Sequence, residues 1–278
     1  MRPQLGPIGI WAHASKLSPR LAQELEALGY SAIWVGGSPP GVLSIVDELL
    51  GATESISVAT GIVNIWSDEA RTVAASHHRI TGAFPGRFIL GIGVGHPEAT
   101  SDYTRPYSSL VEYLDVLDAE GVPQDELVLA ALGPKVMKLA RDRTDGAHPY
   151  LTMPQHTREA RELLGPGKLL APEQKIVVET DAAKARELGR SVVAKPYLGL
   201  RNYLNNLRRF GYEDDDFANR GSDRLIDALV GHGDADTAAQ RVREHLQAGA
   251  DHVPIQLITS KDDNPLDGYR ALARALLS

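Results

Sequence analysis

The stretch Phe88-Ile-Leu-Gly-Ile-Gly-Val-Gly-His-Pro97 decides how the rest of the chain is interpreted. Its apolar start, residues 88–92, is typical of a strand buried on both faces in a parallel sheet. Gly91, Gly93 and Gly95 then remove side chains at every second position, which in a strand marks the close approach of a ligand or of another backbone. The spacing is not the Gly-x-Gly-x-x-Gly of dinucleotide-binding folds. The stretch therefore predicts a buried strand that ends either in a crowded turn or in the wall of a cofactor site.

Composition and charge limit the classes of function. The chain has 278 residues, 43% of them hydrophobic, with a formal net charge of -7 and no cysteine. Interspersed charges with a negative balance argue against nucleic acid as a main partner, and the lack of cysteine excludes a disulfide framework and a thiolate metal site. No apolar run approaches the ~20 residues that span a bilayer, and the first residues lack an apolar signal core. We expect a cytoplasmic protein with no membrane partner.

Strand-like and helix-like segments alternate along nearly the whole chain. Such alternation requires parallel strands joined by right-handed crossovers, and about eight units suit a closed barrel. We therefore predict an α/β fold, a (β/α)8 TIM-type barrel in a single domain over residues 1–278, with a doubly wound open sheet as the alternative. The expected strands are residues 8–11, 32–35, 56–65, 88–92, 127–132, 147–152, 175–179 and 252–258.

Local signals predict where several helices begin. Ser18-Pro19 is a cap followed by proline at the first helical position, and Ser109 and Glu112 have the spacing of a capping box. Gly133-Pro134 leads from the fifth strand into a helix. A glycine turn at a helix N-terminus exposes N–H groups that favour phosphate or carboxylate, so this turn is a candidate anion site.

Functional groups of a barrel gather where its strands end. The predicted strand ends collect His13, Gly36-Gly37, residues 64–66, Gly95-His96, Gly133 and residues 152–156 around one mouth. Imidazole exchanges protons near neutral pH, so His96 and His13 are the candidate catalytic residues. We expect His148 and His156 to line the mouth or cap helices. No cluster of histidine and acidic residues has convincing metal spacing, so we predict no metal site.

With the strand ends assembled, the sequence resembles the luciferase-like oxidoreductases, in particular the bacterial subgroup that uses the deazaflavin coenzyme F420. The resemblance covers nearly the full length. The motifs that carry it are Leu90-Gly-Ile-Gly-Val-Gly-His96, Ala59-Thr-Gly-Ile-Val63, Ala130-Ala-Leu-Gly-Pro-Lys135, and Asp145-Gly-Ala-His-Pro-Tyr150 with Pro154-Gln-His-Thr157. Their order and spacing together are more specific than any one of them.

The resemblance implies a barrel with the tricyclic ring at its mouth, resting on a bulged third strand with a non-prolyl cis peptide. Carried over to this chain, that bulge falls at Gly61-Ile62, and Gly133 and Pro134 would meet the phosphate. The resemblance also implies a homodimer. The cofactor-binding residues that it implies are Thr60, Gly61, Ile62, Asn64, Gly93, Val94, Gly95, Leu132, Gly133, Pro134 and Thr152.

Two departures from the family pattern affect the catalytic assignment. Several relatives carry a catalytic histidine or acid after the second strand, where this chain has Gly36-Gly37-Ser38-Pro39. The usual catalytic assignment therefore cannot be transferred. The segment between the fourth and fifth strands is also short, which predicts a pocket that is open or completed by a partner subunit.

The prediction is an F420-dependent oxidoreductase that transfers a hydride between the deazaflavin ring and a small organic substrate. An FMN-dependent luciferase-like monooxygenase is the alternative within the family. A barrel isomerase or aldolase acting on a phosphorylated substrate is the alternative from another class. It would need a buried lysine or paired carboxylates at strand ends, and Glu179 is the only clear acidic candidate there. A non-catalytic flavin-binding relative also remains open.

Overall fold

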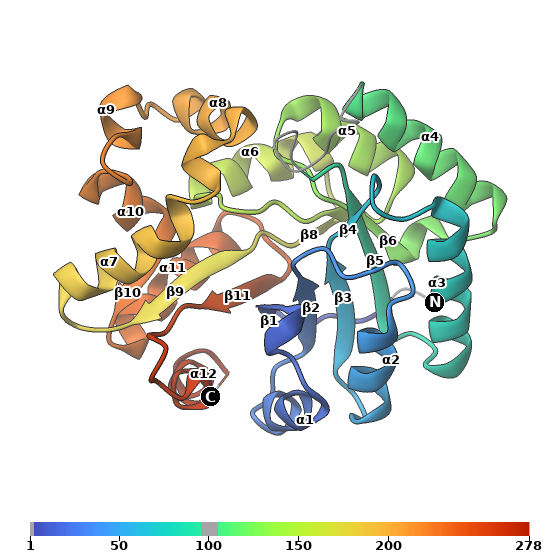
Figure 1. Cartoon of the computed structure of the whole chain (residues 1–278), viewed down its shortest axis with the longest axis horizontal. Coiled ribbons are helices and arrows are strands. Elements are labelled where there is room, and N and C mark those ends of the chain that lie inside the picture. Colours follow the sequence, from blue (N-terminus) through green and yellow to red (C-terminus); the bar gives the residue numbers. More distant parts are fainter. Residues whose placement is uncertain (1–2, 96–104, 278) are drawn as a thin grey trace.

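The computed structural model describes residues 3–95 and 105–277, and its strands form one parallel sheet curled around a central interior (Figure 1). His96, the first of the two predicted catalytic histidines, lies outside the described residues. The strands are β1 (Ile8–His13), β2 (Ala32–Gly36), β3 (Ser57–Gly61), β4 (Val63–Asn64), β5 (Phe88–Gly93), β6 (Leu127–Leu129), β7 (Gly146–Ala147), β8 (Leu169–Leu170), β9 (Gln174–Val178), β10 (Val230–Gly233) and β11 (Val253–Leu257).

Helices follow the strands and cover the outside of the sheet. They are α1 (Pro19–Ala27), α2 (Ser44–Gly51), α3 (Ala70–Ala83), α4 (Pro106–Ala119), α5 (Pro134–Arg143), α6 (Pro154–Leu164), α7 (Ala182–Val193), α8 (Arg201–Arg209), α9 (Asp214–Phe217), α10 (Asp223–Leu229), α11 (Ala235–Gln247) and α12 (Pro265–Leu276). None of these described helices is long and apolar enough to cross a bilayer.

The sheet closes through a strand that is broken in two. β8 pairs with β7, whereas β9, which begins only four residues after β8 ends, pairs with β11. The free edge of β8 is also used, because the Asp251 N–H donates to the Leu170 carbonyl (2.9 Å) just before β11. The two pieces thus form one seventh strand between β7 and β11, and β11 pairs with β1. The predicted (β/α)8 barrel is confirmed.

Several predicted boundaries were wrong, among them the end of the fifth strand, which was expected at residue 132 and lies at Leu129 in β6. The sixth strand, expected over 147–152, is only β7, because the chain leaves the sheet at His148, whose N–H still donates to the Leu129 carbonyl. The fourth helix begins at Pro106, and the Ser109 N–H already donates to the Arg105 carbonyl within the helix. A capping box at Ser109 is therefore excluded. The sequence also gave no sign of β10, which pairs with β9 on the side where β7 ends.

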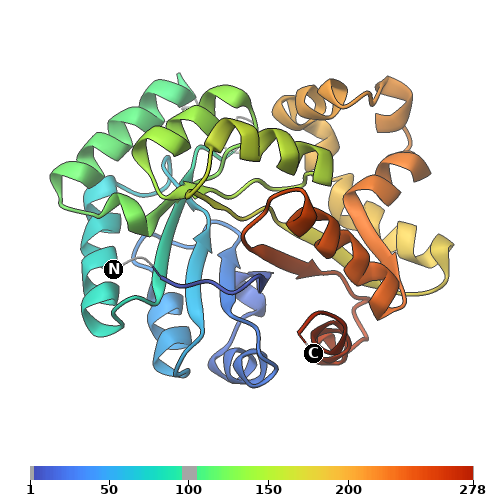
Figure 2. The same cartoon turned by 180° about the vertical axis from the view of Figure 1, so that it is seen from behind.

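Buried apolar side chains form three clusters, of which the smallest, around Trp11 and Trp34, lies inside the barrel. The main cluster of buried apolar side chains lies between the sheet and α1–α6, α11 and α12. A second cluster joins α7–α10 to the segment after β7 and to β9 and β10. Figure 2, from behind, shows α11 and α12 against the last strands, and α11 packs on β9, β10 and β11. The second cluster fixes the long helical segment beside the open end of the barrel.

At the opposite end of the barrel, a carboxylate holds the loop before β3. Glu26 Oε1 accepts hydrogen bonds from the backbone N–H groups of Ser55 (2.6 Å) and Ile56 (2.9 Å). Glu54 N–H adds a third at 3.0 Å. Partial burial raises the pKa of Glu26, but these hydrogen bonds outweigh it and lower the pKa to about 2.

We expect the Glu26→Gln variant to melt about 2–4 °C lower at pH 7, because a neutral amide oxygen is a weaker acceptor than a carboxylate. The pKa in the folded protein lies below the ordinary glutamate value of 4.5, so the carboxylate stabilises the fold above about pH 4.5. That contribution is lost as the pH falls toward 2. The difference in melting temperature from wild type should therefore shrink in acid. Glu48→Gln, on the exposed face of α2, is the control, and equal effects of both variants at pH 7 would contradict this account.

Candidate active site at the barrel mouth

The third strand carries a bulge where it faces the glycine strand. β3 pairs with β5 only through Val58 and Ala59, and the pairing resumes with β4, where Asn64 lies opposite Gly93. Between them, the Gly61-Ile62 peptide bond is cis. The cis peptide that the family resemblance implied is thus confirmed. Both residues are half-buried and lie at the carboxyl end of the strands.

Thr60 replaces the strand pairing that the bulge interrupts. Its hydroxyl accepts from the Gly91 N–H and donates to the Gly91 carbonyl, both at 2.8 Å. The side chain is fully buried. A methyl group on Gly91 would lie 2.0 Å from the Thr60 carbonyl oxygen. Gly91 is therefore a glycine because another backbone passes close by, and Thr60 supports the bulge from below.

The end of the glycine strand is held by Asn64 and Trp66. The Trp66 indole N–H donates to the Val94 carbonyl (2.8 Å), and the Trp66 backbone N–H donates to Asn64 Oδ1 (3.1 Å). Gly95 has φ +56°, and a side chain on it would press against the Asn64 amide. Gly95 is half-buried, so its backbone is partly accessible beside the bulge, whereas Gly93 is buried and a side chain on it would lie 2.8 Å from Ala130 Cβ.

The turn after β6 is the predicted anion site. Gly133 caps α5 with no side-chain hydrogen bond to the helix, and Pro134 is the first helical residue. A methyl group on Gly133 would meet no atom within 4 Å, so the space in front of the helix is open. His156 is buried and its Nε2–H donates to the Leu132 carbonyl (2.8 Å), which holds the turn in place. Thr152 is also buried, and its hydroxyl has no partner among the described residues.

His13, the second predicted catalytic residue, ends β1 in an exposed position. Its Nδ1 accepts from the Ser15 N–H (3.2 Å), so in the neutral ring Nε2 carries the proton. A side chain on Gly37 would lie 2.3 Å from His13 Nε2, and one on Gly36 would lie 2.0 Å from the Trp11 ring. The two glycines at the end of β2 therefore leave room for Trp11 and His13.

Trp11 connects β1 to the bulge. Its indole N–H donates to the Gly61 carbonyl (3.3 Å), and its ring lies 5.3 Å from that of Tyr150. Below it, the Trp34 ring stacks on His148 at 4.3 Å and its N–H donates to His252 Nε2 (3.0 Å). The interior of the barrel is thus filled by aromatic side chains up to the level of the bulge.

The interior histidines are neutral. Burial lowers the pKa of both His148 and His252 to about 4. His148 donates from Nδ1 to the Ala171 carbonyl (2.7 Å), which leaves its Nε2 lone pair facing Gly61 with no described partner. We had expected His148 at the mouth or at a helix cap, but it lies fully inside the barrel. Neither histidine is suited to exchange protons near neutral pH.

A buried ion pair on the seventh strand was missed by the sequence analysis. Lys175 Nζ donates to Glu173 Oε1 (3.1 Å), and both side chains are completely inaccessible to solvent. Desolvation raises the pKa of Glu173 and lowers that of Lys175. Glu179, the acidic residue singled out from the sequence, instead accepts from the Asp181 N–H (2.8 Å) and fixes the turn before α7. The available signal was the spacing of Glu173 and Lys175, which puts both on one face of a strand.

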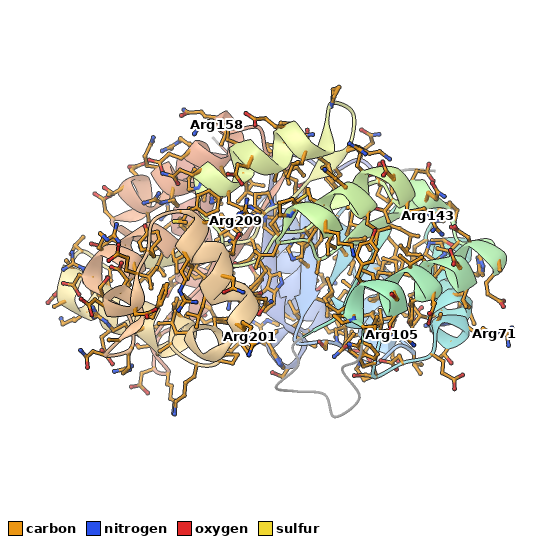
Figure 3. All side chains as sticks on the ribbon, turned by 90° about the horizontal axis from the view of Figure 1, so that it is seen from above. Arg71, Arg105, Arg143, Arg158, Arg201 and Arg209 are labelled. Atoms are coloured by element: carbon orange, nitrogen blue, oxygen red, sulfur yellow. The ribbon has the colours of Figure 1, made fainter. Side chains whose placement is uncertain are left out.

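Figure 3 looks at one side of the barrel and labels six arginines on its outer helices and the turns before them. Arg209 pairs with Glu159, Arg143 with Asp115 and Asp118, and Arg71 with Glu120. Arg105, before α4, and Arg201, at the start of α8, are exposed and have no ion-pair partner in the described part of the chain. Within the same residues, no group of three histidine or acidic side chains has the geometry to hold a metal ion.

The comparisons agree with this architecture. A family model described as luciferase-like monooxygenase matches residues 16–252. A 5,10-methylenetetrahydromethanopterin reductase from Methanolobus tindarius is 24% identical over 297 residues, covering 87% of this chain and 88% of that protein.

Solved structures with little sequence identity share the fold. An F420-dependent secondary alcohol dehydrogenase in complex with an F420-acetone adduct has a TM-score of 0.76 at 16% identity, covering 99% of each chain. The oxygenating constituent of 3,6-diketocamphane monooxygenase from Pseudomonas putida, in complex with FMN, has a TM-score of 0.67 at 14% identity, covering 96% of each chain.

Proposed function

Because the chain belongs to the luciferase-like monooxygenase family, which its family model matches over residues 16–252, we propose that it is an F420-dependent oxidoreductase. In this proposal it transfers a hydride between the deazaflavin ring and a small organic substrate. The observation that carries the proposal is the bulge between β3 and β4 beside the half-buried backbone of Gly95. The structure with the F420-acetone adduct supports the deazaflavin as the coenzyme.

The residues around the mouth fit a flat ring with an anionic tail. Gly61, Ile62 and Asn64 would support one face and edge of the ring, with Gly93, Val94 and Gly95 beside them. Leu132, Gly133 and Pro134 would meet the phosphate, since the first N–H groups of α5 are free of a side-chain cap. Thr152, whose buried hydroxyl has no partner among the described residues, would bond to the same ligand. The exposed Arg105 and Arg201 add positive charge at this end.

Bound there, the coenzyme supplies a two-electron hydride donor or acceptor. The chain's own part is to bind and orient the two reactants, exclude water, and provide a proton near the substrate oxygen. In our proposal His13 or His96 provides this proton. His13 Nε2 carries the proton of the neutral ring and lies at the exposed end of β1.

An FMN-dependent monooxygenase is the second candidate, supported by the FMN complex among the similar structures. Both coenzymes present a similar tricyclic ring and a phosphate. The experiment is a side-by-side titration of the purified protein with F420 and FMN, following ring fluorescence and melting temperature. We expect saturable binding of F420, with a stabilisation of about 2.7 kcal/mol at a concentration of 100 Kd. A preference for FMN would move the assignment to oxygen chemistry, and binding of neither would overturn it.

Gly133 offers a matched pair of variants for this titration. Aspartate and serine are both good helix caps, and neither meets a neighbouring atom within 4 Å at Cβ. Gly133→Asp should weaken coenzyme binding at least about 10-fold, because a carboxylate would face the phosphate. Gly133→Ser should bind nearly as wild type, and both should melt no lower than wild type. Equal binding by the two variants would remove this turn from the phosphate site.

A further inference from the structure

A polar network with a buried ion pair at its centre lies near the carboxyl end of β11. Lys175 Nζ donates to Glu173 and to Gln256 Oε1 (3.1 Å), and lies 3.9 Å from the centre of the Tyr150 ring. The Tyr150 hydroxyl donates to the same Gln256 oxygen (2.8 Å). Gln256 sits near the carboxyl end of β11, next to Lys175 in the sheet register. Two donors thus converge on one amide oxygen.

The hydrogen bonds from Lys175 and Tyr150 fix the orientation of the Gln256 amide. An ammonium group has no acceptor, so the Gln256 atom that faces Lys175 must be the oxygen. The amide nitrogen therefore points the other way, and no described residue accepts its two N–H groups. Gln256 is half-buried, whereas the Glu173 and Lys175 side chains behind it are inaccessible. The two amide N–H groups of Gln256 are therefore the hydrogen-bond donors that the network presents toward the open end of the barrel. The amide oxygen of Gln256 faces the other way.

The position of the network relative to the bulge follows from the aromatic contacts. Trp11 bonds to Gly61 on one side and packs against Tyr150 on the other, and Tyr150 bonds to Gln256. These contacts run from Gly61 through Trp11 and Tyr150 to Gln256, so they link the bulge to the polar network. The ammonium of Lys175 withdraws electron density through the amide oxygen, which strengthens the amide N–H groups as donors.

We propose that Gln256 is the substrate-binding donor that selects a carbonyl compound and stabilises the oxygen of that carbonyl during hydride transfer; this inference rests on the proposed function. The substrate carbon gains a hydride with its two electrons, the C=O π pair moves onto oxygen, and the reduced coenzyme is oxidised by two electrons. The Gln256 N–H bonds to the developing oxyanion until a proton completes the alcohol. Glu173, Lys175 and Tyr150 are positioning residues that act through the Gln256 amide.

The direct test observes the amide itself. In protein with 15N-labelled glutamine side chains, the Gln256 signals are those missing from the Gln256→Glu variant. That variant keeps the oxygen that Lys175 and Tyr150 bond to and removes the N–H donors. We expect cyclohexanone to shift the Gln256 amide signals saturably, with and without F420, while the exposed Gln240 on α11 does not respond. In the Glu173→Gln/Lys175→Met double variant, the affinity for cyclohexanone should fall about 3–10-fold.

Kinetic measurements give a second test, because a purely structural role of Gln256 would not change kcat/KM selectively. With F420 in its reduced form, kcat/KM for ketone reduction should fall about 10²–10³-fold in Gln256→Glu, while the coenzyme Kd stays within about twofold of wild type. If Gln256→Glu is poorly folded, Gln256→Met replaces it.

The outcomes separate the two proposals. Coenzyme binding without any response of Gln256 to cyclohexanone would overturn the role of Gln256 and leave the proposed function standing. A saturable response in protein that binds neither F420 nor FMN would overturn the proposed function and support a carbonyl site. Equal shifts at Gln256 and Gln240 would overturn the role of Gln256, because they would reflect a solvent effect.

Discussion

Replacing Lys175 by methionine is expected to lower the free energy of unfolding by about 3–5 kcal/mol, one of the largest losses available to a single substitution in this chain. Methionine nearly matches the volume of the lysine stem, so packing is retained and the change is mainly electrostatic. Glu173 would then be left completely buried without its cation, and its remaining hydrogen bond comes from the Leu151 N–H (3.2 Å). Urea unfolding followed by circular dichroism measures the loss.

The matched double variant distinguishes an unpaired charge from lost packing. Glu173→Gln/Lys175→Met removes both charges, and the glutamine oxygen keeps the bond from Leu151. Replacing a buried ion pair by neutral side chains costs little on average, so we expect the double variant to recover at least half of the loss. A double variant as unstable as Lys175→Met would show that the lysine stem or its contact with Tyr150 carries the stability instead.

The alternation of strands and helices was predictable because it depends on local periodicity. Ser18 caps α1 by accepting from the Leu21 N–H (3.2 Å), with Pro19 at the first helical position, as the sequence indicated. Gly133 and Pro134 likewise begin α5. These signals act over four residues or fewer, so no knowledge of the tertiary structure is needed to interpret them.

The buried ion pair was not predictable in the same way. Glu173 and Lys175 are charged residues whose side chains are completely inaccessible to solvent. Their partner Gln256 lies 81 residues from Lys175. Tyr150 is 106 residues from Gln256. Only the closed sheet brings them together. β10 was missed for a related reason, because Val230-Gly-His-Gly233 is short and pairs with β9 only where β7 has ended.

The glycines at the mouth show that one sequence feature has two physical origins. Gly36 and Gly37 are next to Trp11 and His13, and Gly91 is next to the Thr60 backbone. Gly133, in contrast, faces open space. The sequence offered a crowded turn and a cofactor wall as alternatives for the glycine strand. Gly91 and Gly93 fit the first, while the half-buried Gly95 leaves backbone accessible at the mouth. The bulge of the third strand connects the crowded position at Gly91 to the mouth, because the close approach of Thr60 to Gly91 sets where the bulge lies.

The Gly91→Ala variant is therefore expected to lose about 3 kcal/mol or more of stability and at least about 10-fold in coenzyme affinity. The added methyl group would lie 2.0 Å from the Thr60 carbonyl oxygen, a backbone atom that no change of rotamer can move. The two strands cannot simply separate, because the Thr60 hydroxyl bonds to both the N–H and the carbonyl of Gly91. Relief requires a shift of β3 next to Gly61-Ile62, which would displace the surface that we assign to the ring.

Gly82→Ala is the control for this substitution. Gly82 lies in α3 with no atom within 4 Å of an added Cβ, so alanine there should raise stability by about 0.5–1 kcal/mol. Urea unfolding gives the two stabilities, and F420 fluorescence gives the two affinities. A Gly91→Ala protein as stable as wild type would show that the bulge yields without cost. A destabilised variant that still binds F420 with wild-type affinity would separate the packing of β5 from the coenzyme site, and the ring would then have to rest elsewhere than on the third strand.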